Sequence, residues 1–290
     1  MRRTLSELLT LLALEQTGED RYSGASVSET SARVFGGQVI AQALVAAART
    51  VDPERAIHSL HGYFLRPGDT SRTISFEVER MRDGKSFATR RVAARQNGEL
   101  IFTLGASFHK HEDGFDHQAP MPSVPPPEDV VLDPALAAKI SQRLPRVISE
   151  WFGEDRAVDV RPILTLMRAD GPNGFPQQAF WVKANGTMDD IAVHHQAIVA
   201  YVSDLGLLPT AGLAHRIGVG SPGTQWASLD HAIWFHRPFR ADEWLLYVQE
   251  SPSAAGGRGY SRGFIFSREG LHVASLAQEG LMRALKPQAP

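Results

Sequence analysis

The stretch His231-Ala-Ile-Trp-Phe-His-Arg-Pro238 decides the fold, because a second stretch of the chain repeats its pattern. The earlier copy is His58-Ser-Leu-His-Gly-Tyr-Phe-Leu-Arg-Pro67, with the same aromatic run and the same Arg-Pro ending. Arg66 and Arg237 are 171 residues apart. Repeats of about 20–50 residues form solenoids, so this longer period indicates a duplicated domain.

Strand-like segments follow both copies in the same order. They cover 57–65, 73–81, 87–95 and 100–109 in the first half, and 226–236, 244–249, 259–267 and 271–277 in the second. Asp83-Gly84 and Asn97-Gly98 supply the positive φ angles that tight hairpins need. Glu269-Gly270 lies where Asn97-Gly98 lies in the first copy, at an offset of 172. Because two landmarks agree on the register, each half is predicted to contain an antiparallel meander.

An apolar helix belongs to each half. Residues 34–49 place a glycine pair before a helix of small and apolar side chains, which must be buried because it is apolar on nearly all sides. In the second half, Asp189 or Asp190 is expected to cap a helix that runs to about Leu205. Prolines gather between 112 and 132, which predicts a surface linker, and 134–151 has helical spacing. We predict an α+β protein with domains at 1–115 and 156–290, joined by a linker and connecting helix at 116–155.

The composition excludes several classes of function. The 290 residues are 43% hydrophobic and 21% charged with a net charge of −2, so no basic excess favours nucleic acid. The chain has no cysteine, which excludes disulfides, thiolate catalysis and Cys-ligated zinc. We see no run of about 20 apolar residues that would span a membrane, and Glu7 interrupts the segment that could pass for a signal peptide. We expect no membrane insertion and a cytoplasmic location.

Two glycine motifs match enzyme patterns by their letters only. Gly259-Tyr-Ser-Arg-Gly263 fits the nucleophile elbow of serine hydrolases, but it lies inside a predicted strand with no helix after it. Gly218-Val-Gly-Ser-Pro-Gly223 fits a dinucleotide fingerprint, but a strand follows where a helix would have to begin. We expect neither to act.

The histidines allow two interpretations. A group at 109–117, with three histidines and two aspartates, could bind a metal, but it lies at a strand end beside the proline linker, where solvated polar residues are common. Four other histidines lie in or beside apolar strands, where a satisfied core histidine is more common than a catalytic one: His58, His61, His231 and His236.

Asp204 is a carboxylate within the apolar segment Tyr201-Val-Ser-Asp-Leu-Gly-Leu-Leu208. Burial of a carboxylate costs several kcal/mol unless it is hydrogen-bonded or paired, so this residue either reaches water at the helix end or takes part in chemistry. Ser228 and Gln278 are neutral polar residues in otherwise strand-like segments of the second half. Neither offers a countercharge, but both could hold a water molecule.

A set of motifs spread over nearly the whole chain resembles the acyl-CoA thioesterase II family, whose members are double hotdog enzymes. In the hotdog fold an antiparallel sheet wraps a long helix, as the meander and helix pattern requires. The motifs are Phe35-Gly-Gly-Gln38, His58-Ser59, Tyr63-Phe-Leu-Arg-Pro-Gly-Asp69, Asp83-Gly84, Ser86-Phe87, Arg91-Val-Ala-Ala94, Ser203-Asp-Leu205, Asp230-His231, Trp234-Phe-His-Arg-Pro-Phe239, Glu243-Trp-Leu-Leu-Tyr247 and Gln278-Glu-Gly280.

The resemblance implies a catalytic trio of Asp204, Ser228 and Gln278. Asp204 would accept a proton from a water that the other two hold, and that water would attack a thioester carbonyl without a covalent intermediate. Threonine is common in the family at the position of Ser228, so the hydroxyl is kept and a methyl group is lost.

Further expectations concern the substrate and the assembly. Backbone amides near Gly36 and Gly37, or at the start of the helix of the second half, are candidate oxyanion donors, because helix N-termini present free N–H groups. His58 is expected to contact substrate. The resemblance implies an acyl-CoA substrate. No cofactor or metal is expected, and a homo-oligomer of double hotdogs is expected. Two alternatives stay open. One is a hotdog dehydratase of 3-hydroxyacyl thioesters, which needs an Asp/His catalytic motif at the start of a hotdog helix, and we expect that motif to be absent. The other is a non-catalytic acyl-CoA binding module.

Overall fold

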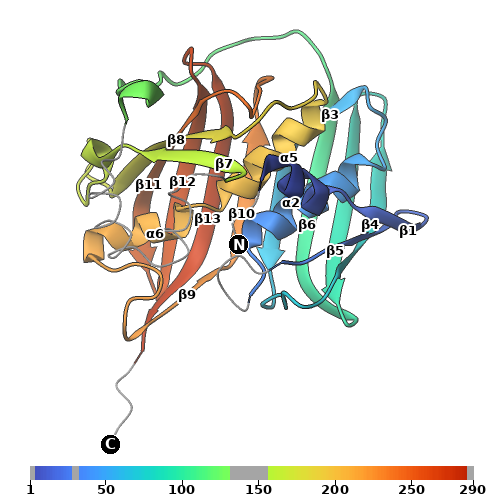
Figure 1. The fold of residues 1–290 in the computed structure, drawn as a ribbon, viewed down its shortest axis with the longest axis horizontal. Coiled ribbons are helices and arrows are strands. Elements are labelled where there is room, and N and C mark those ends of the chain that lie inside the picture. Colours follow the sequence, from blue (N-terminus) through green and yellow to red (C-terminus); the bar gives the residue numbers. More distant parts are fainter. Residues whose placement is uncertain (1–3, 28–32, 131–155, 286–290) are drawn as a thin grey trace, which may run out of the picture.

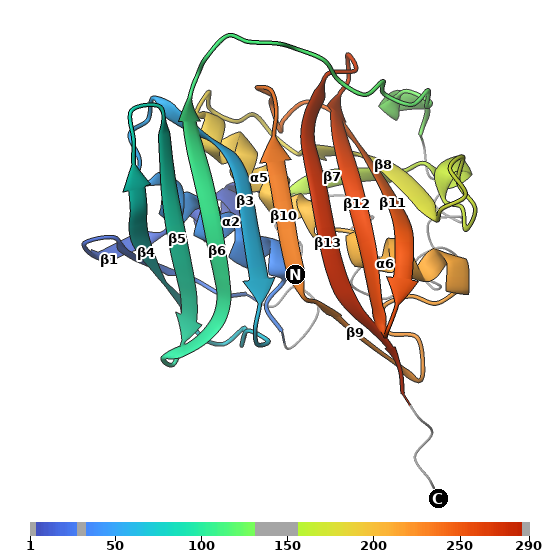
Figure 2. The ribbon, with the colours of Figure 1, turned by 180° about the vertical axis from the view of Figure 1, so that it is seen from behind.

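A computed structural model describes residues 4–27, 33–130 and 156–285 of the chain. Within these residues one 13-stranded sheet runs in the order β1-β2-β4-β5-β6-β3-β10-β13-β12-β11-β8-β7, with β9 also paired to β13. All of the strand pairings are antiparallel. The sheet curves around the helices, with the strands of the first half on one side and those of the second half on the other (Figures 1 and 2).

The first half contributes β1 (Glu15–Gly18), β2 (Arg21–Gly24), β3 (Arg55–Phe64), β4 (Ile74–Asp83), β5 (Phe87–Gln96) and β6 (Glu99–Lys110). The second half contributes β7 (Val158–Pro162), β8 (Gln177–Ala184), β9 (Thr224–Ser228), β10 (Asp230–Phe235), β11 (Leu245–Ala255), β12 (Arg258–Ser267) and β13 (His272–Ala284). The helices are α1 (Leu5–Leu12), α2 (Gly36–Ala48), α5 (Ala192–Ser203) and α6 (Leu207–Gly212), with short 3-10 turns at Pro127–Asp129, Leu164–Leu166 and Leu213–His215.

The two copies of the repeated stretch pair with each other at the centre of the sheet. In the β3–β10 ladder, Leu60 lies opposite Ile233 and Ser59 lies opposite Trp234. This pairing joins two sheets into one, so the predicted double hotdog is confirmed and its halves are related across β3 and β10 (Figure 2).

The central helices α2 and α5 lie side by side against the concave face of the sheet (Figure 1). Both are buried over most of their length, as the apolar pattern of residues 34–49 predicted for α2. A Cβ atom on Gly37 would lie 2.0 Å from the carbonyl oxygen of Tyr201. The N-terminal turn of α2 therefore touches the C-terminal turn of α5 so closely that only glycine fits.

The hairpin predictions were right at one glycine pair and wrong at another. Asn97 and Gly98 have φ angles of 50° and 79°, as a two-residue hairpin with positive φ requires. Gly84 does not adopt positive φ. Its N–H donates instead to the carbonyl of Phe87 at 2.8 Å, so the β4–β5 connection is a longer loop.

Four other expectations need correction or lie outside the described residues. The predicted strand 226–236 is divided at Leu229 into β9 and β10. The helix predicted to run to about Leu205 is α5, which ends at Ser203. Ile191, not an aspartate, is the residue before α5, although Asp189 Oδ1 accepts from the Ile191 N–H at 3.2 Å. The connecting helix predicted at 134–151 lies outside the described residues.

The helical stretch Ala192–His215, which contains α5 and α6, is long and apolar enough to cross a membrane by length and composition. Asp204 and the turn at Gly206 interrupt this stretch between α5 and α6. Of its most apolar window, 72% is buried inside the protein. The stretch is therefore part of the core of the second half.

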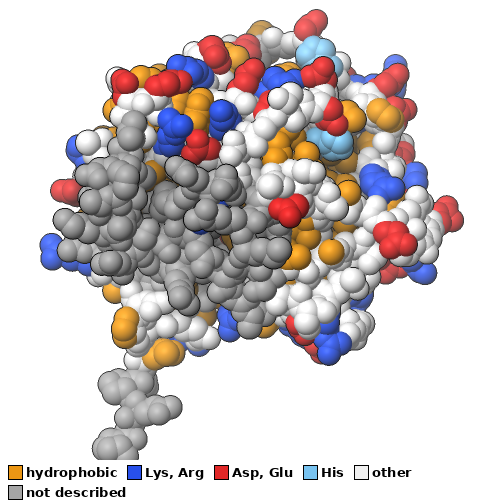
Figure 3. Space-filling view, in the orientation of Figure 1, with side chains coloured by type: hydrophobic (Ala, Val, Ile, Leu, Met, Phe, Trp, Pro, Cys, Tyr) orange, Lys and Arg blue, Asp and Glu red, His pale blue; other side chains and the backbone are white. Residues whose placement is uncertain are grey.

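On the face shown in Figure 3, charges of both signs surround the hydrophobic side chains that reach the surface.

Candidate active site

The end of α5 holds Asp204 in a fixed place. Gly206, at φ 83°, turns the chain from α5 into α6. Helix ends leave carbonyl groups without intrahelical partners, and here buried side chains of β8 and β11 bind them. Tyr247 Oη donates to the Ser203 carbonyl at 2.7 Å, Gln249 Nε2 to the Leu205 carbonyl at 2.7 Å, and Gln178 Nε2 to the Gly206 carbonyl at 2.8 Å. The backbone on both sides of Asp204 is thereby clamped.

The structure brings the three predicted catalytic residues together. Gln278 Nε2 donates to Asp204 Oδ1 at 2.6 Å, and Ser228 Oγ donates to the same oxygen at 3.3 Å. Ser228 and Gln278 are neighbours because β9 pairs with β13, where Ser228 lies opposite Gly280. The Gly37 N–H of α2 also donates to the carboxylate. Both halves of the chain therefore hold Asp204.

A cavity of about 290 Å³ opens in front of the carboxylate. Asp204, Ser228 and Gly36 line it, and Arg33 and Arg66 lie in its first-half wall. Its other walls are largely apolar and come from both halves: Val34, Val39, Phe64, Phe102, Ala227 and Leu229. Gln278 does not line this cavity and is 1% exposed, so it lies behind the carboxylate and contacts it from the protein interior.

The two glycines at the start of α2 have different places in this geometry. A Cβ atom on Gly36 would lie 2.6 Å from Asp204 Oδ2 and 2.9 Å from Phe64 Cζ, so the glycine leaves room between the helix and the carboxylate. The Gly37 N–H is already bound to Asp204. The Gly36 N–H is at the first position of α2 and has no intrahelical acceptor, which leaves Gly36 as the better placed of the two predicted oxyanion donors.

Burial raises the pKa of Asp204 from its ordinary value of 3.8 to about 6. Hydrogen bonds from Gln278, Ser228 and the Gly37 amide act in the opposite direction, because they favour the ionised form. All three donors are neutral. The carboxylate therefore ionises just below neutral pH and keeps more basicity than an aspartate in an ion pair.

A buried histidine, for which the sequence favours the place of an ordinary core residue, contacts this group. His231 lies between Gln278 and Ser203, with Nδ1 3.2 Å from Gln278 Nε2 and Nε2 2.8 Å from Ser203 Oγ. It is 1% exposed, and burial lowers its pKa to about 3. The only sequence signal was its place beside Asp230 in a motif of the second half.

His58 lies elsewhere. Its Nε2 is 2.8 Å from Ser107 Oγ, and its ring packs edge-on against Phe87 and His109. It does not line the cavity that holds Asp204. The geometry therefore gives no support to the substrate contact expected of it.

The two glycine motifs lie in the contexts that were expected. Ser261 of the elbow-like motif is buried within β12, at 1% exposure. The dinucleotide-like segment 218–223 is a loop that leads into β9. Neither contributes to the cavity. Among the described residues, no group of three or more histidine, cysteine, aspartate or glutamate side chains is placed to hold a metal.

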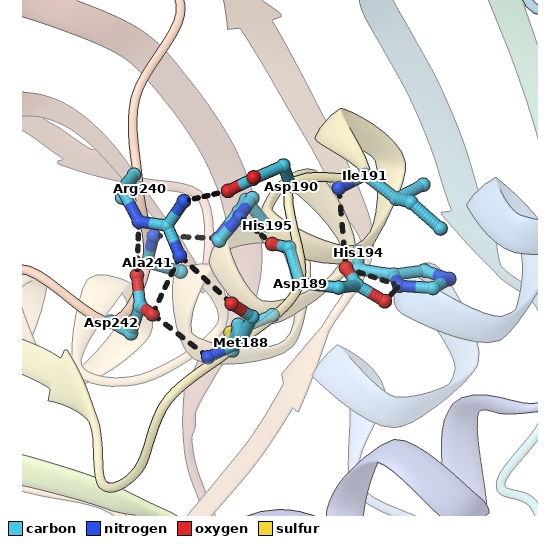
Figure 4. Close-up of polar contacts among 9 residues, drawn as sticks. All are labelled: Met188, Asp189, Asp190, Ile191, His194, His195, Arg240, Ala241 and Asp242. Carbon is cyan, nitrogen blue, oxygen red and sulfur yellow. Dashed lines mark hydrogen bonds and ion pairs between the residues drawn. The ribbon is translucent and has the colours of Figure 1, made fainter.

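A second group of charged residues surrounds the start of α5 (Figure 4). Arg240 binds Asp242, Asp190 and the Met188 carbonyl, and His194 Nδ1 lies 2.9 Å from Asp189 Oδ2. The dehydratase alternative asks for an Asp/His catalytic motif at the start of a hotdog helix, and Asp189 and His194 are the residues that lie there. The pair is largely exposed, and neither residue lines the Asp204 cavity.

Comparison with known proteins places the whole chain beside thioesterases. The family model described as "Acyl-CoA thioesterase" matches residues 147–281, and the model described as "Acyl-CoA thioesterase N-terminal domain" matches residues 26–109. The chain is 40% identical to acyl-CoA thioesterase 2 of Haemophilus influenzae, over 98% of this chain and 99% of that protein. It is 42% identical to mouse acyl-coenzyme A thioesterase 8, over 96% of this chain and 89% of that protein.

A solved structure agrees with these matches. The crystal structure of the acyl-CoA thioesterase II TesB2 from Mycobacterium marinum is similar, with a TM-score of 0.80 and 43% sequence identity. The likeness covers 98% of this chain and 99% of that one. Both halves and the site between them therefore lie within the matched region.

Proposed function

The chain belongs to the acyl-CoA thioesterase family, and from this premise we propose that it hydrolyses acyl-CoA thioesters to free fatty acid and CoA with Asp204 as the general base. The sequence resemblance to this family and to its double hotdog fold was right.

One observation carries the mechanism: a carboxylate faces a largely apolar cavity and is held by neutral donors. A cationic partner would lower the pKa of the carboxyl and make it a poor base. Neutral donors hold the carboxylate in place while burial keeps its pKa at about 6. A general base acts best when its pKa lies near the working pH.

The reaction follows from this arrangement. Asp204 takes a proton from a water molecule as the water oxygen bonds to the thioester carbonyl carbon. The carbonyl oxygen becomes an oxyanion, and the Gly36 N–H at the positive end of α2 stabilises it. The C–S bond then breaks, the proton held by Asp204 passes to the leaving sulfur, and the products are a carboxylic acid and the CoA thiol. General-base catalysis typically contributes ~10²–10⁴-fold.

Ser228 and Gln278 have separate roles in this scheme. Ser228 lines the cavity, so its hydroxyl can contact both the carboxylate and the attacking water. Gln278 donates to Asp204 from behind, so its amide sets the position of the carboxylate. Its Oε1 is buried and accepts no hydrogen bond from the described residues, and a bound water could satisfy it.

The test is free-thiol release from acyl-CoAs of several chain lengths, measured for the native chain and for the Asp204→Asn variant. We expect release by the native chain and a loss of ~10²-fold or more in the variant, as general-base catalysis of this size implies. Thiol release from none of the substrates would refute the hydrolase, and tight acyl-CoA binding without turnover would make it a binding module. Full activity of the Asp204→Asn variant would refute the assigned base.

Dehydration of 3-hydroxyacyl thioesters is a second candidate, favoured by the Asp189–His194 pair at the start of α5. Such a reaction needs an acid and a base beside the β-carbon of a bound substrate. The exposure of this pair and its place outside the cavity favour hydrolysis instead. The two reactions differ in the product: loss of water from a 3-hydroxyacyl-CoA without thiol release would favour the dehydratase.

We further propose a cytoplasmic homo-oligomer of double hotdogs. The sheet ends at β1 and β7, and unpaired strand edges and curved sheet faces are common association surfaces. Light scattering of the purified chain tests the oligomer, with a mass of 31.8 kDa as the monomer result. Cell fractionation tests the location.

A further inference from the structure

We propose that His231 is a positioning residue for the hydrolysis: it fixes the orientation of the Gln278 amide, and the amide holds the Asp204 carboxylate. The inference rests on the proposed function, because it assumes that Asp204 is the base. His231 does not line the cavity, so it touches neither the substrate nor the water and acts through Gln278.

A directed chain of hydrogen bonds sets the protonation of His231. Ser203 Oγ donates its one hydrogen to the Ala200 carbonyl at 2.7 Å, so it must accept from His231 Nε2 at 2.8 Å. The imidazole is buried and neutral, with its pKa at about 3. With the hydrogen on Nε2, Nδ1 is an acceptor, and Gln278 Nε2 donates to it at 3.2 Å.

Gln278 is thereby held in one of its two amide orientations. Its Nε2 has two hydrogens, one directed to His231 Nδ1 and one to Asp204 Oδ1. Half a turn of the amide would place Oε1 against both acceptors. On the other side of the amide, Oε1 accepts no hydrogen bond from the described residues, so among these residues it is the Nε2 contacts that select the orientation.

The protonation state of Asp204 makes His231 necessary. The ionised carboxylate prefers the Nε2 side of Gln278 by itself. A protonated carboxyl could donate to Oε1 instead, and a turned amide would then stabilise the inactive, protonated form. His231 opposes that turn in both states, because its Nδ1 accepts only from Nε2. Loss of His231 should therefore raise the apparent pKa of the base.

The first half of the chain shows that the fold does not require these polar residues. In the β3–β6 ladder Leu60 lies opposite Ala106. The repeat offsets of 171 and 172 align these residues with His231 and Gln278. Leu60 and Ala106 are buried, at 0% and 2% exposure. Apolar side chains satisfy the same positions where no catalytic aspartate is present, so the polar pair belongs to the site.

Few other charged or titratable groups face Asp204. Tyr247 of β11 is buried, and burial raises its pKa well above 10, so it stays neutral between pH 5 and pH 9. Arg33 and Arg66 line the same cavity. His231 stays neutral as well. A change in the acid limb of the rate profile therefore reports on Asp204.

The test compares His231→Leu, which installs the residue of the first half, with His231→Asn, whose Oδ1 can replace Nδ1 as an acceptor. The kcat, the KM and the pH profile are measured by thiol release from one acyl-CoA. For His231→Leu we expect kcat to fall ~10–100-fold, as for residues that orient a catalytic group, KM to change little, and the acid limb to move to higher pH. His231→Asn should recover most of both effects.

Two further variants keep the proposal falsifiable if His231→Leu folds poorly. Ser203→Ala removes the acceptor for His231 Nε2 and frees the hydrogen to move to Nδ1, so it should move the acid limb in the same direction. In a Gln278→Leu background, His231→Leu should cost little more, because coupled residues are not additive. The proposal would be overturned if the acid limb did not move in either His231→Leu or Ser203→Ala. It would also be overturned if His231→Leu lowered kcat by the same factor in the native and the Gln278→Leu backgrounds. An active Asp204→Asn enzyme would instead refute the base itself.

Discussion

The Cβ position of Gly36 lies 2.6 Å from Asp204 Oδ2, so the helix of the first half approaches the carboxylate of the second half closely enough to exclude any side chain. The α2 helix therefore forms one wall of the catalytic site although Asp204, Ser228 and Gln278 all lie in the second half. Duplication built the architecture, and the site lies where the N-terminus of one central helix meets the C-terminus of the other.

Substitution of Gly36 by alanine should damage catalysis more than folding. The added methyl group must push the Asp204 carboxylate or the Phe64 ring aside, and a displacement of this kind can cost ~10²-fold in rate. Thiol release and thermal unfolding are measured together.

Two matched glycine variants separate the causes. Gly37→Ala would place its Cβ 2.0 Å from the backbone oxygen of Tyr201, which cannot move away, so it should lower stability by several kcal/mol as overpacked helix contacts do. In Gly105→Ala the added Cβ atom would meet no other atom within 4 Å, so this variant should leave both rate and stability nearly unchanged. If Gly36→Ala kept the native rate, the space in front of Asp204 would have no part in the reaction.

The rate should depend on pH through Asp204. The base accepts a proton only when ionised, and its pKa is about 6. The kcat/KM should therefore be constant above pH 7 and fall about tenfold per pH unit below pH 6. Thiol release between pH 4.5 and pH 8.5 in buffers of constant ionic strength gives the profile. A midpoint near 4 would mean that the carboxyl is solvated in the free enzyme.

The free energy of unfolding should also depend on pH through Asp204, and it should fall as the pH rises. A carboxyl whose pKa is 3.8 in the unfolded chain and about 6 in the folded chain is disfavoured in its ionised form by folding. The penalty is absent below pH 4, grows as the pH rises through 6, and reaches about 3 kcal/mol above it. The free energy of unfolding of the native chain should thus fall relative to Asp204→Asn between pH 4 and pH 8. A constant difference between the two proteins over that range would contradict the raised pKa.

Ser228 should be replaceable by threonine but not by alanine. The hydroxyl lies 3.3 Å from Asp204 Oδ1, a long hydrogen bond for a side chain with free rotation. Threonine restricts χ1, so Ser228→Thr should keep or improve kcat. Ser228→Ala removes a donor that favours the ionised carboxylate, and should lower kcat ~10-fold and move the acid limb to higher pH. Equal rates for the alanine and serine enzymes would remove Ser228 from the mechanism.

The sequence predicted the fold well because each of its signals can be recognised within a short stretch of residues. Two landmarks with the same offset aligned the halves, and a carboxylate in an apolar helix marked Asp204. The role of His231 was missed, because it depends on the contact with Gln278, 47 residues away along the chain. The division of the strand at Leu229 also arises from distant partners, since its N–H donates to the Glu279 carbonyl and its carbonyl accepts from Phe64.

The Asp189–His194 pair should have no part in thioester hydrolysis. His194 lies at the exposed start of α5, where Asp189 also accepts from the Ile191 N–H, so the pair stabilises the first turn of the helix. Asp189→Asn and His194→Ala should each leave kcat within about twofold and change the melting temperature little, because an exposed ion pair contributes little to stability. The measurements are thiol release, thermal unfolding and the loss of water from a 3-hydroxyacyl-CoA. If the native chain catalysed such a loss of water and either variant abolished it, the start of α5 would be a second active site within the second half.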